Sequence, residues 1–313
     1  MNKTKVVAIV GPTASGKTAF SIALAKELGG EIVSADSMQI YRGMDIGTAK
    51  PTAKERDGVP HHMIDIVDLK EEFSVAKYCA MAHTVIENIH ARGNLPIVVG
   101  GTGLYVDALL NDITFGEVVG DESIRARLHE LAKEQGNGAV YALLEQEDPA
   151  AAERLHPNNL RRVIRAIEMK RLTGISILEH EAKSVEKQTR YDAVIFGMRM
   201  DREVLYDRIN RRVDRMIELG LWDEVKVLQE YLRESKTSVQ GLGYKELLQS
   251  LDGEISSDEA IEILKRDSRR YAKRQMTWFR RNPNILWIDA EQSVSDMIGI
   301  AKQTIGERWG INA

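Results

Sequence analysis

The sequence predicts an α/β fold in which a parallel sheet with flanking helices is interrupted by a helical insertion. Two observations lead to this prediction. Short apolar runs typical of buried strands alternate with amphipathic helical patterns in the N-terminal part of the chain. A glycine-rich segment from Gly11 to Thr18 follows the first apolar run and opens the first helical pattern, with the G-x-x-x-x-G-K-[ST] spacing of a phosphate-binding P-loop. The core is therefore expected to be a sheet of the P-loop NTPase kind.

The expected elements follow one another simply along the chain. In the core, the patterns predict strands at 5–10, 31–35, 96–100, 193–198 and 285–288, and helices at 16–28, 73–91, 201–219, 222–234 and 257–279. Between about residues 121 and 180 only helical patterns occur. The predicted domains are a P-loop core of residues 1–113 plus 189–313 and a helical insertion of residues 114–188.

Composition is that of an ordinary globular protein. Of 313 residues, 43% are hydrophobic and 29% are charged, and the net charge of −4 predicts no general affinity for nucleic acid. Basic residues are nevertheless concentrated between 265 and 281. No apolar run approaches the roughly 20 residues of a membrane span, and the chain enters a strand without a signal peptide. The single cysteine, Cys79, excludes an internal disulfide and is expected to be a packing residue, which favours a cytoplasmic protein.

The glycine-rich segment predicts a site for a phosphate group. Its glycines let the backbone curl so that N–H groups point at an anion, and the following helix N-terminus adds partial positive charge. Lys17 is expected to reach a distal phosphate oxygen, and Thr18 to hold Mg²⁺. The pattern does not say which phosphate compound is bound. The residues assigned to this site are Gly11, Pro12, Thr13, Ala14, Ser15, Gly16, Lys17 and Thr18.

Two further loops are expected at the same edge of the sheet. Asp36 follows the second strand, so its carboxylate should face the P-loop, where it could accept a proton from a nucleophile or hold Mg²⁺ through water. The alternative is a turn or helix-cap residue. The third strand ends in the loop Gly100–Gly103, where many P-loop NTPases carry a metal-binding aspartate. This chain has no aspartate at that position, which argues against a mechanochemical ATPase.

Two arginine clusters are candidate phosphate contacts. Arg208, Arg212 and Arg215 recur at i, i+4 and i+7 on one predicted helix, where they could clamp a diphosphate or form surface ion pairs. In the insertion, residues 161–165 carry three arginines, which could contact phosphate or lie on a solvated helix face.

Six segments, in order and over nearly the whole chain, resemble the tRNA dimethylallyltransferases, the tRNA isopentenyltransferases of bacteria. They are GPTASGKT (11–18), DSMQIYRGMDIGTAKP (36–51), VGGTGLY (99–105), HPNNLRRVIRAIE (156–168), QGLGYKE (240–246) and YAKRQMTWFRRN (271–282). The resemblance implies transfer of a dimethylallyl group from dimethylallyl diphosphate to N6 of adenosine-37 in tRNA, giving N6-isopentenyladenosine and diphosphate. No cysteine or histidine follows His180, so the resemblance is to the compact bacterial form, and the zinc finger of eukaryotic relatives is not expected.

The resemblance also implies roles for individual residues. The P-loop would bind the diphosphate with Mg²⁺, Asp36 would be the general base, and Thr13, Lys17 and Arg212 would lie at the reacting centre. The target base would be splayed out of the anticodon loop. The residues implied in contacting tRNA are Asp36, Ser37, Met38, Gln39, Thr102, Arg125, Arg161, Arg162, Arg165, Gln240, Gly241, Gly243, Tyr244 and Lys245, with the basic helix at 265–281 as a further backbone contact.

Three other functions remain open at this point. A small-molecule kinase using ATP would explain the P-loop and Asp36, but not the basic insertion. Prenyl transfer to free adenine nucleotide would use the same chemistry without needing an arginine-rich insertion. A nucleic-acid-binding module without activity would not need a complete P-loop. The expected partners are tRNA and dimethylallyl diphosphate, without a membrane or an obligate protein partner.

Overall fold

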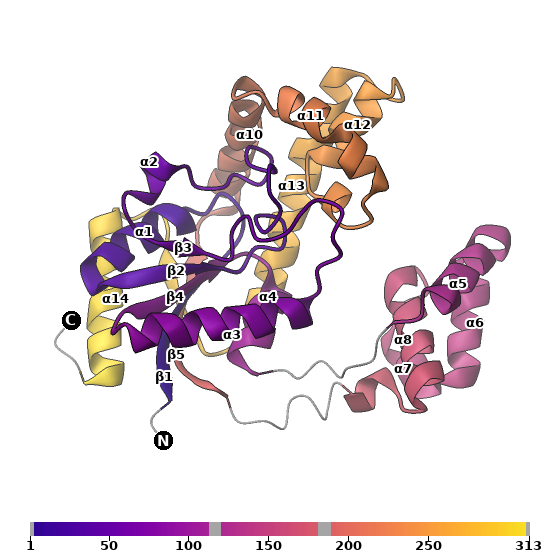
Figure 1. Cartoon of the computed structure of the whole chain (residues 1–313), viewed down its shortest axis with the longest axis horizontal. Coiled ribbons are helices and arrows are strands. Elements are labelled where there is room, and N and C mark those ends of the chain that lie inside the picture. The colour runs from indigo at the N-terminus through magenta and orange to yellow at the C-terminus, as the bar shows by residue number, and fades with distance from the viewer. Residues whose placement is uncertain (1–2, 113–119, 181–188, 311–313) are drawn as a thin grey trace. The chain divides into compact units, whose positions relative to one another are not determined.

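The computed structural model describes residues 3–112, 120–180 and 189–310. The chain divides into two compact units, one formed by residues 1–110 with 190–313 and the other by residues 111–189 (Figure 1). The predicted boundary positions 113, 114 and 188 lie outside the described residues. Each unit is treated separately below.

The larger unit contains the predicted parallel sheet. Its strands are β1 (Thr4–Val10), β2 (Gly30–Ser34), β3 (His61–His62), β4 (Leu95–Gly100), β5 (Tyr191–Arg199) and β6 (Ile285–Asp289). They form a six-stranded sheet in the order β3-β2-β4-β1-β5-β6, and each pair of neighbours is parallel. The predicted P-loop core is therefore confirmed. The sequence patterns did not predict β3, because two residues are too few to show a period.

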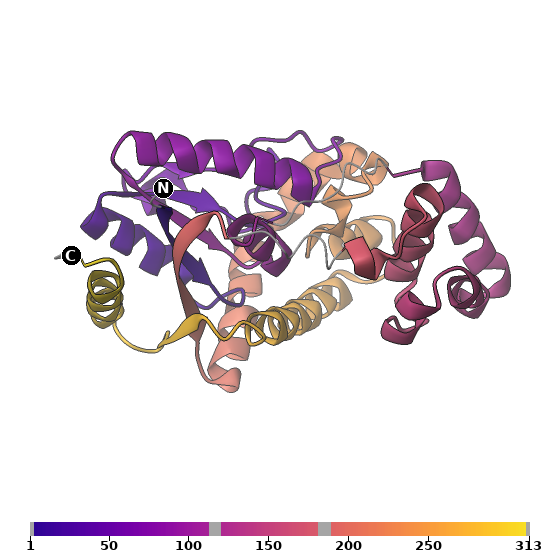
Figure 2. The ribbon, with the colours of Figure 1, turned by 90° about the horizontal axis from the view of Figure 1, so that it is seen from below.

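Helices cover both faces of this sheet. The helices described in the larger unit are α1 (Lys17–Leu28), α2 (Ala53–Arg56), α3 (Val75–Ala91), α4 (Gly103–Leu110), α10 (Arg202–Glu218), α11 (Leu221–Glu234), α12 (Tyr244–Leu251), α13 (Ser257–Phe279) and α14 (Val294–Trp309), with a short 3₁₀ turn at Ser238–Gln240. Figure 2 shows α3 on one side of the strands and α14 on the other, and α14 lies beside α1. The sequence analysis did not predict α2, α12 or α14.

Apolar packing under α1 and α14 forms one core of this unit. Phe20 on α1 meets Phe196 on β5 edge to face, with ring centroids 6.5 Å apart. Burial of large apolar side chains is the main stabilising contribution here, at roughly 1.5–3 kcal/mol for each. Cys79 lies buried on α3. Among the described residues, no helix is both long and apolar enough to cross a bilayer.

The smaller unit consists of helices around its own core, as the sequence predicts. They are α5 (Glu122–Gln135), α6 (Asn137–Glu147), α7 (Pro149–Arg154) and α8 (Leu160–Thr173). Asp121 caps α5 by accepting the N–H groups of Ser123 and Ile124. The buried side chains shared by these helices include Leu128, Val140 and Ile167.

The register of the sheet brings three loops together. Val10 of β1 is paired with Gly100 of β4, and Ser34 of β2 with Val99 of β4. The loops that follow these strands therefore begin at neighbouring points on the carboxyl edge of the sheet, which is where ligands bind in open parallel sheets.

Gly100 is required for this close approach, and its replacement is expected to destabilise the fold. A Cβ atom at Gly100 would lie 2.1 Å from the carbonyl oxygen of Ala35. Because backbone cannot move aside without disturbing the β2–β4 pairing, we expect Gly100→Ala to lower the free energy of unfolding by about 1–3 kcal/mol. Gly299→Ala is the control, since Gly299 lies in helix α14 with open space around it. Chemical denaturation measures both, and equal stability of the two variants would contradict the prediction.

Candidate active site

Three positive φ angles give the backbone of the P-loop its tight curl. Gly11 and Gly16 have φ angles of 148° and 86°, and Ala14 between them has a φ of 63°. Lys17 folds back over the loop, and its Nζ donates to the carbonyl oxygen of Pro12 at 2.6 Å. The hydroxyl of Ser15 is buried without a hydrogen-bond partner. A buried polar atom of this kind is costly unless a ligand satisfies it, so the loop is suited to an anion.

Three charged side chains converge beside this loop. Burial, and then the positive charge of Arg212, lower the pKa of Lys17 to about 7, although the carboxylate of Asp36 opposes both effects. Burial also lowers the pKa of Arg212, again opposed by Asp36. Two crowded cations with one carboxylate leave a net positive charge that a bound anion would neutralise.

Asp36 forms a turn, which was its alternative role, and it also borders a pocket. Its Oδ1 accepts the backbone N–H groups of Met38 (2.9 Å) and Gln39 (3.3 Å), as in an Asx turn. Asp36 also lines a pocket of the larger unit. The turn therefore fixes the orientation of a carboxylate that borders the pocket.

This pocket has a volume of about 230 Å³. Seven of its lining residues were predicted for the site, namely Thr13, Asp36, Ser37, Met38, Arg212, Gln240 and Gly241. The sequence analysis missed its apolar wall, which consists of Ile209, Val213, Met216, Leu242 and Leu264. It did not assign Gly47 and Thr48 to the site, and it considered Ser268, Tyr271 and Arg274 only as part of the basic helix at 265–281. The first three wall residues recur at i, i+4 and i+7 on α10, a spacing that is equally typical of core packing.

Gln275 on α13 joins two of the three loops. Its Oε1 accepts the N–H of Thr13 at 2.9 Å, and its Nε2 donates to the carbonyl oxygen of Gly101 at 2.9 Å. Tyr271, one turn earlier on α13, hydrogen-bonds with Gln275 and Thr102, and burial raises its pKa to about 12. No sequence pattern separates Gln275 from the other polar residues of this helix. Its buried side chain now links the P-loop to the Gly-Gly-Thr loop.

Several residues predicted to contact tRNA are engaged in internal hydrogen bonds. Thr102 Oγ1 accepts the N–H of Ser37 at 3.1 Å. Gln39 Nε2 donates to the carbonyl oxygens of Thr48 (3.2 Å) and Ala49 (3.3 Å). Tyr244 is fully buried at the start of α12, after Gly243, whereas Lys245 is exposed. These contacts shape the loops, and direct contact of the same residues with a base stays a prediction.

In the smaller unit, two of the predicted arginines surround one buried carboxylate. Glu168 on α8 is fully buried, and its two oxygens accept from Arg125 Nε (2.7 Å) and Arg165 Nη1 (2.6 Å). Arg161 and Arg162 at the start of α8 are exposed. Of the four arginines predicted to contact tRNA, two are therefore exposed and two are partly exposed and paired with Glu168.

The other predicted basic residues are less available than the sequence suggests. Of the stripe on α10, only Arg212 lines the pocket, while Arg215 pairs with Glu218 at 3.1 Å. On α13, Lys265 pairs with Asp214 at 2.7 Å. Arg266 and Arg270 both pair with Asp267. Three of the basic residues between 265 and 281 thus have acidic partners.

Thr18 is the residue predicted to hold a divalent cation. It lies exposed in the first turn of α1, next to the P-loop. In the part of the chain that the structure describes, no group of three or more histidine, cysteine, aspartate or glutamate residues could hold a metal. A Thr18 hydroxyl together with phosphate oxygens and water is a donor set that fits Mg²⁺.

Comparisons with known proteins agree with this geometry. The family model described as IPP transferase matches residues 39–282. The tRNA dimethylallyltransferase of Halalkalibacterium halodurans is 53% identical over 287 residues, covering 92% of this chain and 91% of the relative. That of Acetivibrio thermocellus is 51% identical over 292 residues, covering 93% of each.

Two solved structures are also similar. The full-length tRNA isopentenylpyrophosphate transferase of Bacillus halodurans has a TM-score of 0.74 and 50% identity, covering 98% of this chain and 97% of that one. A eukaryotic dimethylallyltransferase acting on tRNA has a TM-score of 0.79 and 32% identity, covering 96% of this chain and 79% of that one.

Proposed function

Because the chain belongs to the IPP transferase family, to which it is similar over nearly its whole length, we propose that it transfers a dimethylallyl group from dimethylallyl diphosphate to N6 of adenosine-37 in tRNA. One observation carries the proposal: the P-loop, Asp36 and Arg212 converge on one pocket that also has an apolar wall. A tRNA substrate favours a cytoplasmic location.

The proposed reaction forms one bond and breaks another. N6 of adenine attacks C1 of the dimethylallyl group, and the bond from C1 to the diphosphate oxygen breaks, leaving its electron pair on the diphosphate. The N6 proton passes to the carboxylate of Asp36. Negative charge develops on the diphosphate, so the P-loop N–H groups, Lys17 and Arg212 stabilise the transition state more than the ground state. Bound Mg²⁺, held by Thr18, would add charge neutralisation of the diphosphate.

The pocket lining supports a prenyl donor over ATP. Ile209, Val213 and Met216 present one apolar face of α10 beside Arg212. A five-carbon apolar chain next to a diphosphate needs this combination, because apolar contact holds the chain while cations hold the charge. A kinase would need donors and acceptors for a nucleoside instead.

In the same proposal, the smaller unit grips the anticodon stem. Arg161 and Arg162 are exposed, and Arg125 and Arg165 are partly exposed. Guanidinium groups of this kind bind phosphates without reading sequence. The target adenine must leave the stack to reach Asp36, at a cost of a few kcal/mol.

Product analysis tests the function directly. Purified protein is mixed with Mg²⁺, dimethylallyl diphosphate and tRNA lacking hypermodification at position 37, and a parallel reaction contains AMP in place of tRNA. We expect prenylated adenosine from tRNA alone. Product from AMP alone would overturn the tRNA assignment. Absence of product from both, with ATP consumption on adding small alcohols, would favour the kinase alternative.

Donor binding is expected to depend on the protonation of Lys17. The pKa of this group in the free protein is about 7, and a bound diphosphate raises it because the negative charge favours the ammonium. The kcat/KM for dimethylallyl diphosphate should therefore fall above about pH 7, with proton uptake on binding. Lys17→Arg stays protonated throughout and should flatten the profile. A donor affinity independent of pH from about 6 to 9 would contradict this assignment.

A further inference from the structure

One carboxylate on α11 holds an entire turn of a loop beside the pocket. Glu224 Oε2 accepts the backbone N–H groups of Asp45 (2.9 Å) and Ile46 (2.7 Å), and Oε1 accepts that of Gly47 (3.1 Å). The hydroxyl of Tyr244 also donates to Oε1, at 2.7 Å. A single glutamate thus satisfies three consecutive backbone donors, and hydrogen bonds to an ionised acceptor are roughly twice as strong as neutral ones.

Tyr244 packs against the turn that Glu224 binds. A Cβ atom at Gly47 would lie 2.6 Å from two carbons of the Tyr244 ring, so only glycine leaves room for the ring there. The ring is fully buried. The tyrosine therefore packs its ring against the turn and donates from its hydroxyl to the anchoring carboxylate.

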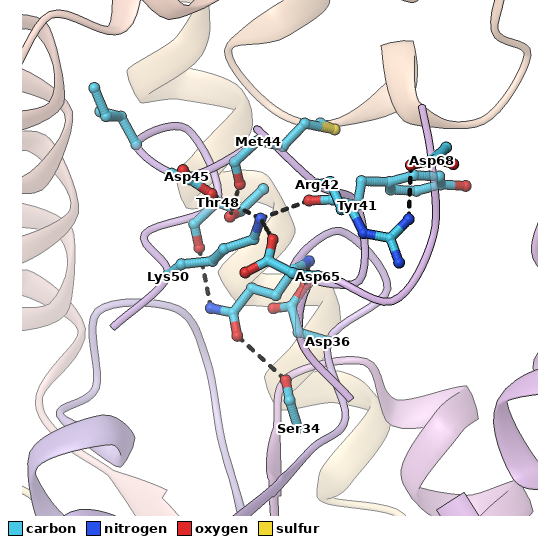
Figure 3. A network of polar contacts seen from close by, with 12 residues as sticks. Ser34, Asp36, Tyr41, Arg42, Met44, Asp45, Thr48, Lys50, Asp65 and Asp68 are labelled. Carbon is cyan, nitrogen blue, oxygen red and sulfur yellow. Dashed lines mark hydrogen bonds and ion pairs between the residues drawn. The ribbon is translucent and has the colours of Figure 1, made fainter. Parts of the chain in front are cut away.

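The loop is braced separately by Lys50 (Figure 3). The buried ammonium of Lys50 donates to the carbonyl oxygen of Tyr41 at 2.5 Å and to Asp45 Oδ1 at 2.8 Å. It also pairs with Asp65. Asp45 thus takes part both in the contacts of Lys50 and in the turn that Glu224 holds. The loop from Tyr41 to Lys50 is therefore held by Lys50 as well as by Glu224.

We infer that Glu224 is a positioning residue that holds the Asp45–Gly47 turn so that Gly47 and Thr48 form a wall of the active-site pocket. Both residues line that pocket together with Asp36. Glu224 is not among its described lining residues, so it acts through the loop. The inference rests on the proposed function, in which this wall receives the adenine of tRNA. Donor binding should not depend on the turn, because the P-loop residues that hold diphosphate are elsewhere.

Glu224→Gln tests the inference with little change of side-chain size. The glutamine side chain has only one oxygen to accept from the three backbone N–H groups and the Tyr244 hydroxyl, and it carries no charge. We expect kcat/KM for tRNA to fall about 10- to 100-fold, the scale on which misplaced binding groups act. The KM for dimethylallyl diphosphate should stay at the wild-type value. Hydrogen exchange at the amides of residues 45–47 should accelerate, while exchange in the P-loop stays unchanged.

Two further variants keep the test decisive. Tyr244→Phe removes one hydroxyl and should give a smaller change of the same kind even if Glu224→Gln folds poorly. Asp223→Asn is the matched control, because Asp223 lies on the same helix, is largely exposed and pairs only weakly with Lys226, at 3.6 Å. Wild-type kinetics in both test variants would overturn the inference, and so would an equal loss toward both substrates.

Failure of the proposed function can be distinguished from failure of the inference about Glu224. Wild-type protein without transfer to tRNA would reject that function whatever the variants do. Amide exchange at residues 45–47 measures the anchor without any substrate. Unchanged exchange there in Glu224→Gln would overturn the anchoring role even if the enzyme is active.

Discussion

Asp36→Asn is expected to lower the single-turnover rate of prenyl transfer by about 10²–10⁴-fold, the usual contribution of a positioned general base. Asparagine retains the oxygen that accepts the N–H groups of Met38 and Gln39, so the turn should survive. It cannot take the proton from N6. Donor affinity should be measured below pH 7, because loss of the carboxylate removes the group that raises the pKa of Lys17.

The control for this experiment is Asp57→Asn. Asp57 lies at an exposed helix end and pairs with Lys26 at the surface. It has a positive φ of 46°, which asparagine tolerates. If Asp36→Asn turned over at nearly the wild-type rate, Asp36 would be removed as the base, and the proton would have to leave through water.

The sequence predicted the elements that have a clear period or a defined motif. The P-loop needs its glycines at fixed positions, and buried parallel strands need continuous apolar runs, so β1, β2, β4 and β5 were predicted within two residues of their observed ends. Helix α12 was not predicted, because its first residue follows two glycines in the segment 240–246 and its apolar positions are few. Helix α14 shows only a weak apolar stripe along one face.

The missing parts of the site depend on contacts between distant residues. Glu224 is one of several acidic residues on an amphipathic helix, and its bonds join it to residues 177 to 179 positions earlier. Gln275 reaches the P-loop across 262 positions. Nothing in the local pattern distinguishes such a residue from a solvated one, because its role is defined only when the sheet brings the loops together.

The predicted basic helix shows how contacts between helices modify a count of charges. Between 265 and 281 the count indicates a cationic face, but several of these cations have acidic partners on α10 or on α13 itself. Spacing identifies Asp267 on the same helix but not Asp214, because Asp214 lies on α10 in another segment of the chain. Arg212 differs from its neighbours because it lines the pocket, where the charge of the Asp36 carboxylate opposes the lowering of its pKa by burial.

Arg212→Ala is expected to lower kcat/KM for dimethylallyl diphosphate by about 10²–10³-fold, the typical effect of removing one donor aimed at developing charge. Arg212→Lys should recover only part of the loss, because an ammonium cannot form the two parallel bonds that a guanidinium makes to a phosphate. Arg215→Ala is the matched control one turn away, since Arg215 is exposed and pairs with Glu218.

The pH dependence of the Arg212→Ala defect separates a role in the site from general disruption. Arg212 lowers the pKa of Lys17, so its removal should raise that pKa above its present value of about 7. Below pH 7 the wild-type protein has two cations for the diphosphate and the variant has one. Above pH 7 the wild-type protein loses the charge of Lys17, whereas the variant retains it. The defect should therefore shrink as pH rises. A defect of constant size would show that Arg212 does not share a diphosphate with Lys17.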